Sequence, residues 1–330
     1  MTPPPPMLDV RGLTVQFRTE SGWLTAIEDV GFDLAAHETL GIVGESGSGK
    51  SVTALTLLRL HSAHAARVAA GSAVFEGQDL LGLPERAMRR IRGGQIAMIF
   101  QDPMSSLNPV LTIADQIGEA LRLHHGLPPR AARARAAELL DLVRIPDARR
   151  RLDDYPHRLS GGMRQRVMIA MAIACRPRLL IADEPTTALD VTIQAQILDL
   201  LRTLQRELGM AVILISHDLG IVAEFAARVM VMYGGRVAEI GPANPLYRAP
   251  LHPYTAGLLA AVPRLDVTAR RLAAIPGSLP DPGEAMPGCR FAPRCTEALA
   301  ACHSAAPPLL SVGGGRFARC PPRVAAQGGA

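Results

Sequence analysis

Two kinds of apolar pattern along the chain predict strands. Apolar and polar residues alternate over Leu13–Phe17 and Val30–Leu34, which is typical of half-buried strands. Shorter uninterrupted apolar runs predict strands that are buried on both faces. These runs are Leu40–Val43, Ile96–Phe100, Leu179–Ala182 and Ala211–Ile215.

Helical spacing of apolar residues fills most of the intervals between these runs. The sequence predicts helices over Lys50–Leu60, Arg130–Arg144, Met163–Ala174 and Val191–Leu208, and a largely helical region over Asn108–Arg158. Asp190 is positioned to cap the helix that Gly209 ends. Strands that alternate with helices indicate an α/β fold.

The amino-acid composition and the periodicity of the chain change after about residue 260. A hairpin is expected over Val229–Tyr233 and Arg236–Ile240, with Gly234 and Gly235 as its turn. Beyond residue 260, proline, glycine and cysteine increase and periodicity fades. We therefore expect a disordered lead over 1–7, a main domain over 8–260 with a helical subdomain at about 104–175, and a smaller C-terminal domain over 261–330.

Composition narrows the possible functions only modestly. No apolar run reaches the roughly 18 residues that a membrane-spanning helix needs, so any membrane role is expected to be peripheral. The net charge is +5 without a dense basic patch, which gives nucleic-acid binding little support. Of the 35 basic residues only Lys50 is a lysine, which suggests that this position requires a compact ammonium group.

Lys50 lies in a complete phosphate-binding motif between a predicted strand and a predicted helix. Glycines allow such a loop to aim backbone N–H groups at phosphate oxygens, and the following helix adds its positive end. We expect Lys50 to reach the β- and γ-phosphates of a nucleotide and the Ser51 hydroxyl to bind Mg²⁺. The expected nucleotide-binding residues here are Gly44, Glu45, Ser46, Gly47, Ser48, Gly49, Lys50, Ser51 and Val52.

Two acids follow the buried run Leu179–Ala182. Asp183 is expected to hold Mg²⁺ directly or through water. Glu184 follows at once and is expected to accept a proton from the attacking water, a role that contributes about 10²–10⁴-fold in rate. Together with the phosphate-binding loop, this pair predicts nucleotide hydrolysis.

The segment Leu159–Gln165, LSGGMRQ, resembles the signature of ABC ATPases. Ser160, Gly161 and Gly162 form a hydroxyl and amide nest at the start of a helix, which predicts a second anion site. The resemblance implies a P-loop NTPase fold with a RecA-like core, an antiparallel β subdomain and a helical subdomain. It also implies a head-to-tail dimer in which each signature caps the nucleotide of the other cassette.

Further positions match this family. Gln101 resembles the glutamine that contacts Mg²⁺ and water, Asp190 the aspartate at the dimer seam, and His217 the histidine that contacts the γ-phosphate. The family stacks an aromatic residue on adenine, and Phe17 is the preferred candidate, with Trp23 as the alternative. His37 replaces a usual glycine, and because histidine tolerates positive φ comparatively well, we expect only a small local cost.

Longer stretches, such as AMIFQDPMSSLNP and HPYT at 252–255, resemble the D-type ATP-binding subunits of bacterial dipeptide and oligopeptide permeases. This implies a peptide importer at the cytoplasmic face of the inner membrane. Its partners would be two membrane subunits, an extracytoplasmic peptide-binding protein and a second, F-type ATPase. Nickel importers of the same branch are the alternative. A soluble ABC ATPase lacks supporting features, and an inactive subunit is contradicted by Lys50, Glu184 and His217.

The C-terminal region contains four cysteines with C-x5-C-x6-C-x17-C spacing, which matches neither zinc ribbons nor bacterial ferredoxins. The residues alone leave zinc, an iron–sulfur cluster and free thiols open. The resemblance implies a [4Fe–4S] cluster with a structural role. Cys175 lies in an apolar helix and is expected to be a small buried side chain. The four expected ligands are Cys289, Cys295, Cys302 and Cys320.

Overall fold

The computed structural model describes residues 5–102, 106–187, 189–262, 275–280 and 286–326. The chain forms two compact units, which are described separately. Unit 1 comprises residues 1–35, 39–82 and 214–330, and unit 2 comprises residues 36–38 and 83–213. Residues 1–4 of the predicted N-terminal lead lie outside the described residues, as does position 104, the predicted start of the helical subdomain. Met7, at the end of the lead, is buried.

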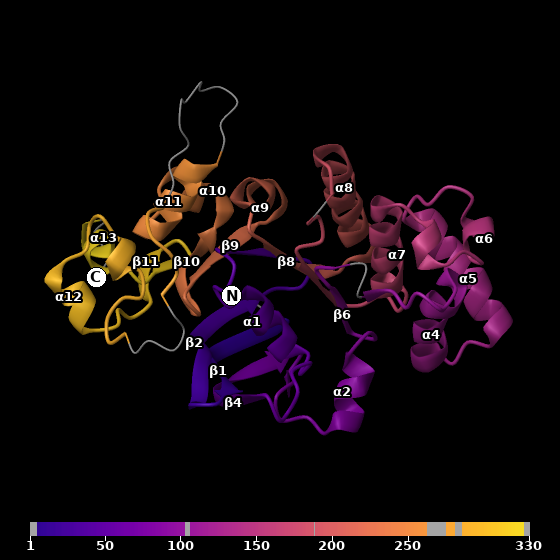
Figure 1. Ribbon diagram of the computed structural model, residues 1–330, viewed down its shortest axis with the longest axis horizontal. Helices are drawn as coiled ribbons and strands as arrows, with labels where there is room; N and C mark the ends of the chain where they lie inside the picture. The colour runs from indigo at the N-terminus through magenta and orange to yellow at the C-terminus, as the bar shows by residue number, and fades with distance from the viewer. Residues whose placement is uncertain (1–4, 103–105, 188, 263–274, 281–285, 327–330) are drawn as a thin grey trace. The chain divides into compact units, whose positions relative to one another are not determined.

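An antiparallel sheet in unit 1 has the strand order β2-β1-β4-β5. The strands are β1 (Leu8–Thr19), β2 (Gly22–Leu34), β4 (Ala66–Phe75) and β5 (Gln78–Asp79). The alternation predicted over Leu13–Phe17 and Val30–Leu34 is confirmed, but both strands are longer, because β1 and β2 pair from Leu8↔Leu34 to the hairpin end at Thr19↔Gly22. Figure 1 shows these strands side by side in indigo.

A second group of strands in unit 1 has the order β11-β12-β10-β9-β3. Strand β3 is parallel to β9, whereas β9, β10, β12 and β11 pair as antiparallel neighbours. The predicted hairpin is confirmed, and Gly234 and Gly235 both adopt positive φ in its turn. The strands are β3 (Thr39–Val43), β9 (Arg228–Tyr233), β10 (Arg236–Pro242), β11 (Leu310–Gly313) and β12 (Arg316–Ala318).

Helix α1 (Lys50–Leu57) of unit 1 is shorter than the predicted Lys50–Leu60. The backbone of Arg59 turns to a φ of 50°, and the N–H groups of Arg59 and Leu60 donate to Thr56 and Leu55. This is a Schellman-type end with arginine where glycine is usual, so the sequence carried no signal for it. The other helical segments are α9 (Leu219–Phe225), α10 (Ala243–Arg248), α11 (Pro253–Ala261), η2 (Ala292–Arg294), α12 (Ala300–Ser304) and α13 (Pro321–Ala326).

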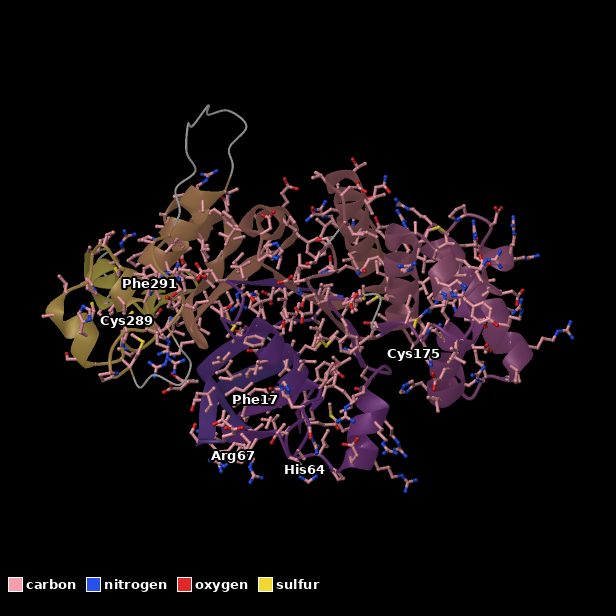
Figure 2. The ribbon with its side chains drawn as sticks, in the orientation of Figure 1. Phe17, His64, Arg67, Cys175, Cys289 and Phe291 are labelled. Atoms are coloured by element: carbon pink, nitrogen blue, oxygen red, sulfur yellow. The ribbon has the colours of Figure 1, made fainter. Side chains whose placement is uncertain are left out.

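The C-terminal part of unit 1 has a small apolar core of its own. Leu251, Ala318 and Val324 are buried together, and Leu310 and Val312 pack against them. This core joins the start of α11 to β11, β12 and α13. Cys289, the first of the four C-terminal cysteines, is labelled in this part of the chain in Figure 2.

Unit 2 contains the parallel strands β6 and β7 and the longest of the described helices. The strands pair from Ile96↔Leu179 to Ile99↔Ala182. Strand β8 (Ala211–Ser216) begins in unit 2 and ends in unit 1. The remaining elements are α2 (Glu85–Ile91), β6 (Ile96–Ile99), α4 (Ile113–His125), α5 (Pro129–Leu142), α6 (Ala148–Arg151), η1 (Pro156–Arg158), α7 (Gly161–Ile173), β7 (Leu179–Asp183) and α8 (Val191–Leu208).

The ends of α8 match the sequence prediction. The Asp190 carboxylate accepts a 2.9 Å hydrogen bond from the Ile193 N–H, and Gly209 ends the helix with a φ of 65°. His37 adopts a φ of 63°, as expected from its place in the turn before β3. The Gln205 side chain donates to the His37 carbonyl, which helps to hold this strained residue.

Candidate functional site

The loop Gly44–Gly49 joins the buried strand β3 to α1 in unit 1. Lys50 is only 5% exposed, and its Nζ donates to the carbonyl oxygens of Gly44 at 2.8 Å and Glu45 at 2.9 Å. The ammonium group is therefore held against the backbone of the loop in which it lies. Ser51 and Val52 follow in the first turn of α1, where backbone N–H groups lack intrahelical partners.

Glycine is required in this loop for two different reasons. Gly47 has a φ of 79° in open space, a left-handed conformation that side chains disfavour. Gly49 has a φ of 101°, and a Cβ there would lie 2.5 Å from Cγ2 of Ile27 in β2. The loop thus packs against the first sheet and leaves its Ser46–Gly47 rim exposed. In a loop of this shape, backbone N–H groups can bind a phosphate group.

Two aromatic residues lie on the first sheet of unit 1, close to this loop in sequence. Phe17 is partly buried, and its ring meets that of His61 edge to face at 5.1 Å. Trp23 is 41% exposed and lies beneath the Arg67 guanidinium at 4.2 Å. Figure 2 marks Phe17 and Arg67 on this sheet. Phe17 as the adenine-stacking residue stays a prediction.

In unit 2, the predicted catalytic base and the predicted Mg²⁺-contacting glutamine are hydrogen-bonded. Gln101 Nε2 donates to Oε2 of Glu184 at 2.9 Å, and the Thr187 hydroxyl donates to the same oxygen at 2.9 Å. Asp183 is 4% exposed at the end of β7 and directly precedes Glu184. The strand end therefore presents two carboxylates, one buried and one oriented by two donors.

The signature segment LSGGMRQ also lies in unit 2. Ser160 caps α7, and its Oγ accepts a 3.4 Å hydrogen bond from the Met163 N–H. Ser160 and Gly161 are exposed. A Cβ at Gly162 would lie 2.9 Å from Cγ2 of Ile193, so a side chain there would press into α8. The structure thus places Ser160 and Gly161 at an exposed, serine-capped helix N-terminus, and the anion site there stays a prediction.

His217 lies in unit 1, directly after β8. It is exposed, and the next residue, Asp218, caps α9 by accepting hydrogen bonds from the N–H groups of Gly220 and Ile221. The imidazole is therefore carried on a short loop that is fixed at both ends. Lys50, Ser51 and His217 belong to unit 1, whereas Gln101, Ser160, Asp183, Glu184 and Asp190 belong to unit 2.

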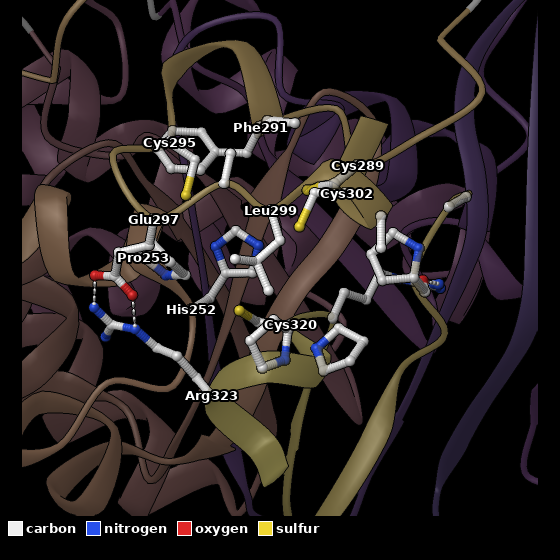
Figure 3. Close-up of a pocket in the computed structure, with 18 of the residues that line it drawn as sticks. His252, Pro253, Cys289, Phe291, Cys295, Glu297, Leu299, Cys302, Cys320 and Arg323 are labelled. Carbon is white, nitrogen blue, oxygen red and sulfur yellow. Dashed lines mark hydrogen bonds and ion pairs between the residues drawn. The ribbon is translucent and has the colours of Figure 1, made fainter. Parts of the chain in front are cut away.

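All four C-terminal cysteines line one cavity of about 300 Å³ in unit 1. Figure 3 shows Cys289, Cys295, Cys302 and Cys320 around it, with the Arg323–Glu297 ion pair at its side. Burial raises the pKa of the Cys289, Cys295 and Cys320 thiols. Among the described residues, no three Cys, His, Asp or Glu side chains converge closely enough to hold a single metal ion. The thiols therefore surround a space rather than a point.

The cavity wall also contains His252, from the HPYT segment. Its backbone N–H donates to buried Glu239 at 2.9 Å, and its Nδ1 accepts from the Tyr254 N–H at 3.1 Å. Burial lowers the pKa of His252 to about 3, so the ring is neutral at physiological pH. HPYT was recognised from the sequence only as a family motif, and its structural role comes from these contacts.

Sequence reasoning missed one residue that touches the phosphate-binding loop. Arg294, between Cys289 and Cys295, forms a two-bond ion pair with the Glu45 side chain. Because 249 residues separate the two positions, no local sequence pattern predicts this contact.

Comparison with known proteins finds family matches over two parts of the chain. Residues 27–187 match the ABC transporter family, and residues 238–302 match the C-terminal region of oligopeptide/dipeptide transporters. A Brucella abortus protein named as a candidate peptide import ATP-binding protein is 62% identical over 319 residues, covering 97% of this chain and 96% of that protein. A Brucella melitensis protein of the same description is 54% identical over 326 residues, covering 96% of each.

Solved structures give the same answer for the fold. A dimeric ATP-binding cassette in a post-hydrolysis state with ADP and phosphate has a TM-score of 0.65 and 27% identity, covering 72% of this chain and 99% of that one. A Clostridium perfringens protein described as part of an ABC transporter complex has a TM-score of 0.62 and 26% identity, covering 74% and 92%.

This chain belongs to the ATP-binding proteins of the ABC transporter family. Its C-terminal region is that of the oligopeptide and dipeptide transporters. The predicted P-loop ABC fold is thereby confirmed, and so is the prediction of an ATPase coupled to transport. ATP and Mg²⁺ are the ligands that this family implies. None of the helices within the described parts of the chain is both long and apolar enough to cross a bilayer.

Proposed function

We propose that this chain binds and hydrolyses ATP to power the import of dipeptides or oligopeptides. The observation that carries the proposal is the presence, on one chain, of the cassette match and the oligopeptide/dipeptide C-terminal match. Relatives named as candidate peptide import ATP-binding proteins, aligned over almost the whole chain, support the same substrate class.

The proposed chemistry divides among named side chains. Lys50 would neutralise the β- and γ-phosphates, and the Ser51 hydroxyl and Asp183 carboxylate would supply oxygen ligands of the kind that Mg²⁺ prefers. Glu184, oriented by Gln101 and Thr187, would accept the proton of the attacking water. Gln101 would also hold Mg²⁺ and water, and His217 would contact the γ-phosphate.

A second ATP-binding subunit is part of the proposal. The exposed N-terminus of α7, at Ser160 and Gly161, offers N–H groups for an anion that a partner cassette would bring. Asp190 would lie at the same seam. One solved relative is described as a dimer, which supports the arrangement. We propose a related F-type subunit as the partner, with two membrane permease subunits and an extracytoplasmic peptide-binding protein completing the importer at the cytoplasmic face of the inner membrane.

Reconstitution tests the proposed function directly. The chain would be co-purified with the proposed permease subunits and second ATPase, placed in proteoliposomes and supplied with the matching binding protein. Stimulation of ATP hydrolysis by a peptide-loaded binding protein, with peptide accumulating in the lumen, is the expected result. Stimulation by nickel but by no peptide would assign the chain to the nickel importers of this branch.

The four-cysteine cavity is proposed to hold a [4Fe–4S] cluster. A tetrahedral zinc site places its sulfurs roughly 3.8 Å apart, given Zn–S bonds of about 2.3 Å. Four thiols line one cavity of about 300 Å³, which leaves room for a polynuclear cluster, and the described residues hold no preformed group of three donors for a single ion. Cys289, Cys295, Cys302 and Cys320 would be its thiolate ligands, and the cluster would supply cross-linking of the C-terminal region rather than catalysis.

Anaerobic purification with iron and acid-labile sulfide assays tests this part of the proposal. About four of each per chain is expected, with a visible absorption band that is lost in a Cys302→Ser variant. A colourless protein without iron would exclude the cluster, and stoichiometric zinc would replace it with a mononuclear site.

A further inference from the structure

Arginines next to three of the cavity cysteines form ion pairs with acids of strand β2 and of the phosphate-binding loop. Arg290, beside Cys289, pairs with Glu28 at 2.6 Å. Arg294, beside Cys295, pairs with Glu45. Arg319, beside Cys320, pairs with Asp29 at 2.6 Å and lies, like the other two, within unit 1. Three of the four cysteine positions are thus directly joined to ionic contacts outside the cavity.

The Arg294 contact has the geometry of a strong ion pair. Nη1 lies 2.7 Å from Oε2 of Glu45 and Nη2 lies 3.0 Å from Oε1, so the two planar groups face each other. The Arg294 side chain is 6% exposed, and that of Glu45 is 27% exposed. Its Nε donates to the Pro276 carbonyl, which fixes the orientation of the guanidinium. Hydrogen bonding to Glu45 raises the pKa of Arg294.

Glu45 is the second residue of the phosphate-binding motif and is held at three places. Its N–H donates to the Tyr254 hydroxyl at 2.9 Å, its carbonyl accepts from Lys50 Nζ at 2.9 Å, and its carboxylate accepts from Arg294. Two of these three contacts come from residues beyond 250. The C-terminal region thus holds the N–H and the carboxylate of Glu45, whose carbonyl accepts from Lys50 and from the Ser48 N–H of the loop.

An aromatic cluster connects this contact to the cysteine cavity. The ring of Tyr233 lies 4.6 Å from Tyr254 and 5.1 Å from Phe291, with edge-to-face geometry in both pairs. Arg294 Nη1 also donates to the Tyr233 hydroxyl at 3.3 Å. Phe291 lines the cavity between Cys289 and Cys295 (Figure 3). A change in cavity packing must therefore displace a ring that contacts both tyrosines.

We propose that Arg294 is a positioning residue for nucleotide binding, which acts through Glu45 to set the shape of the phosphate-binding loop. The inference rests on the proposed binding of ATP by that loop. This role of Arg294 would make the cysteine-containing segment a control element, because any state of the cavity that moves Arg294 changes nucleotide affinity. By thermodynamic reciprocity, bound nucleotide stabilises the cysteine segment to the same extent.

Equilibrium binding of a fluorescent ADP analogue to the full chain tests the proposal without turnover. Arg294→Gln is expected to weaken binding about tenfold, within the usual range of coupling between sites. Arg294→Lys should fall between this variant and the wild type, because lysine keeps the charge and loses the fork. The matched control is Arg248→Gln, which replaces an exposed arginine at the end of α10 in the same unit. Equal affinities for Arg294→Gln and Arg248→Gln would overturn the proposal.

A double-mutant cycle separates positioning from general destabilisation. If Arg294 acts through Glu45, then Glu45→Gln combined with Arg294→Gln should bind no more weakly than either single variant. Fully additive losses would show that Arg294 acts by another route. Hydrogen exchange gives an independent readout, since ADP should slow exchange over residues 289–295 in the wild type and not in Arg294→Gln. Unchanged exchange in the wild type would also refute the coupling.

A Lys50→Ala variant distinguishes failure of this inference from failure of the proposed function. If the wild type binds the analogue, Lys50→Ala does not, and Arg294→Gln binds like the wild type, only the positioning role of Arg294 fails. If the wild type does not bind at all, the proposed nucleotide site itself is wrong.

Discussion

The side-chain amide of Gln101 donates a 2.9 Å hydrogen bond to Oε2 of Glu184, which also accepts from Thr187. Gln101 follows β6, and Glu184 follows β7, which is parallel to β6. The ends of these two neighbouring strands thus bring the side-chain amide of Gln101 against the carboxylate of Glu184, the predicted general base. Two donors on one oxygen fix the orientation of the carboxylate.

Replacing Glu184 by glutamine should leave nucleotide binding intact and lower ATP turnover about 10²–10⁴-fold, because the amide cannot accept the proton. Single-turnover hydrolysis and nucleotide affinity would be measured together. A closed dimer with the partner subunit should accumulate in the presence of ATP. Glu207→Gln, an exposed isosteric change on α8, is the control. Normal turnover in Glu184→Gln would remove this residue from the role of base.

Gln101→Ala should have a smaller effect than loss of the base itself. It removes one of the two donors to Oε2 and leaves the Thr187 contact. A hydrogen bond contributes about 1 kcal/mol, so we expect turnover to fall roughly five- to tenfold with nucleotide affinity little changed. Comparison with Thr187→Val, which removes the other donor, checks this explanation. An effect as large as that of Glu184→Gln would mean that Gln101 has a chemical role of its own.

Lys50→Arg should abolish tight nucleotide binding despite conserving the charge. The ammonium is 5% exposed and fits between two carbonyls at 2.8 and 2.9 Å, a space that a planar guanidinium cannot occupy in the same way. Binding of the fluorescent ADP analogue provides the measurement. The control is Arg149→Lys, the reverse exchange at an exposed position in α6, which should be neutral. Wild-type affinity in Lys50→Arg would refute the geometric argument.

Glu239→Gln should destabilise the C-terminal part of unit 1. The carboxylate is 0% exposed and accepts hydrogen bonds from the N–H groups of Leu251 and His252 and from Arg316. Loss of the charge leaves Arg316 without its buried anion, which costs on the order of 3 kcal/mol.

Chemical denaturation would measure the change in unfolding free energy for this substitution. Glu297→Gln breaks an ion pair in which the glutamate side chain is 48% exposed, and this control should cost less than about 1 kcal/mol. Similar losses in the two variants would argue against the buried network around Glu239 as the source of stability.

Cys175 should resist alkylation in the folded protein. It is 6% exposed, and burial raises the pKa of its thiol from 9.0 to about 11. Below pH 9 the thiol is protonated in both states. Between pH 9 and 11 the unfolded thiol ionises first, so the free energy of unfolding should fall as the pH rises through this window. Iodoacetamide labelling at pH 8, with and without urea, tests accessibility, and Cys175→Ala should remove the pH-linked component. Rapid labelling of Cys175 itself in the native protein, located by peptide mass mapping, would contradict the prediction.

Local sequence patterns were sufficient for the parts of the site that depend on neighbours in the chain. The loop before Lys50, the cap at Asp190 and the turn at Gly234 follow from residues within a few positions of one another, and the structure has each where the pattern predicted it. The end of α1 was predicted too late, because arginine at position 59 adopts a conformation that usually marks glycine.

Contacts between distant segments were beyond the reach of such patterns. Arg294 is one of 34 arginines in the chain. The residues next to it in the sequence do not indicate that it pairs with Glu45 rather than lying in solvent. The common cavity of the four cysteines likewise depends on α11, η2, α12 and α13 folding together. The sequence indicated a shared role for these cysteines only through resemblance to a family.

Strand β12 pairs with β10 through Glu239↔Ala318 and Ile240↔Phe317, and this pairing has a consequence for protein engineering. A chain shortened to end after α11 would leave β10 as a bare edge, with hydrogen-bonding groups open to any other extended peptide. Such a fragment is expected to self-associate even though it retains the whole phosphate-binding loop. The C-terminal region therefore also protects the edge of β10 from aggregation. A stand-alone cassette would need charged or proline substitutions along β10 to prevent pairing with other chains.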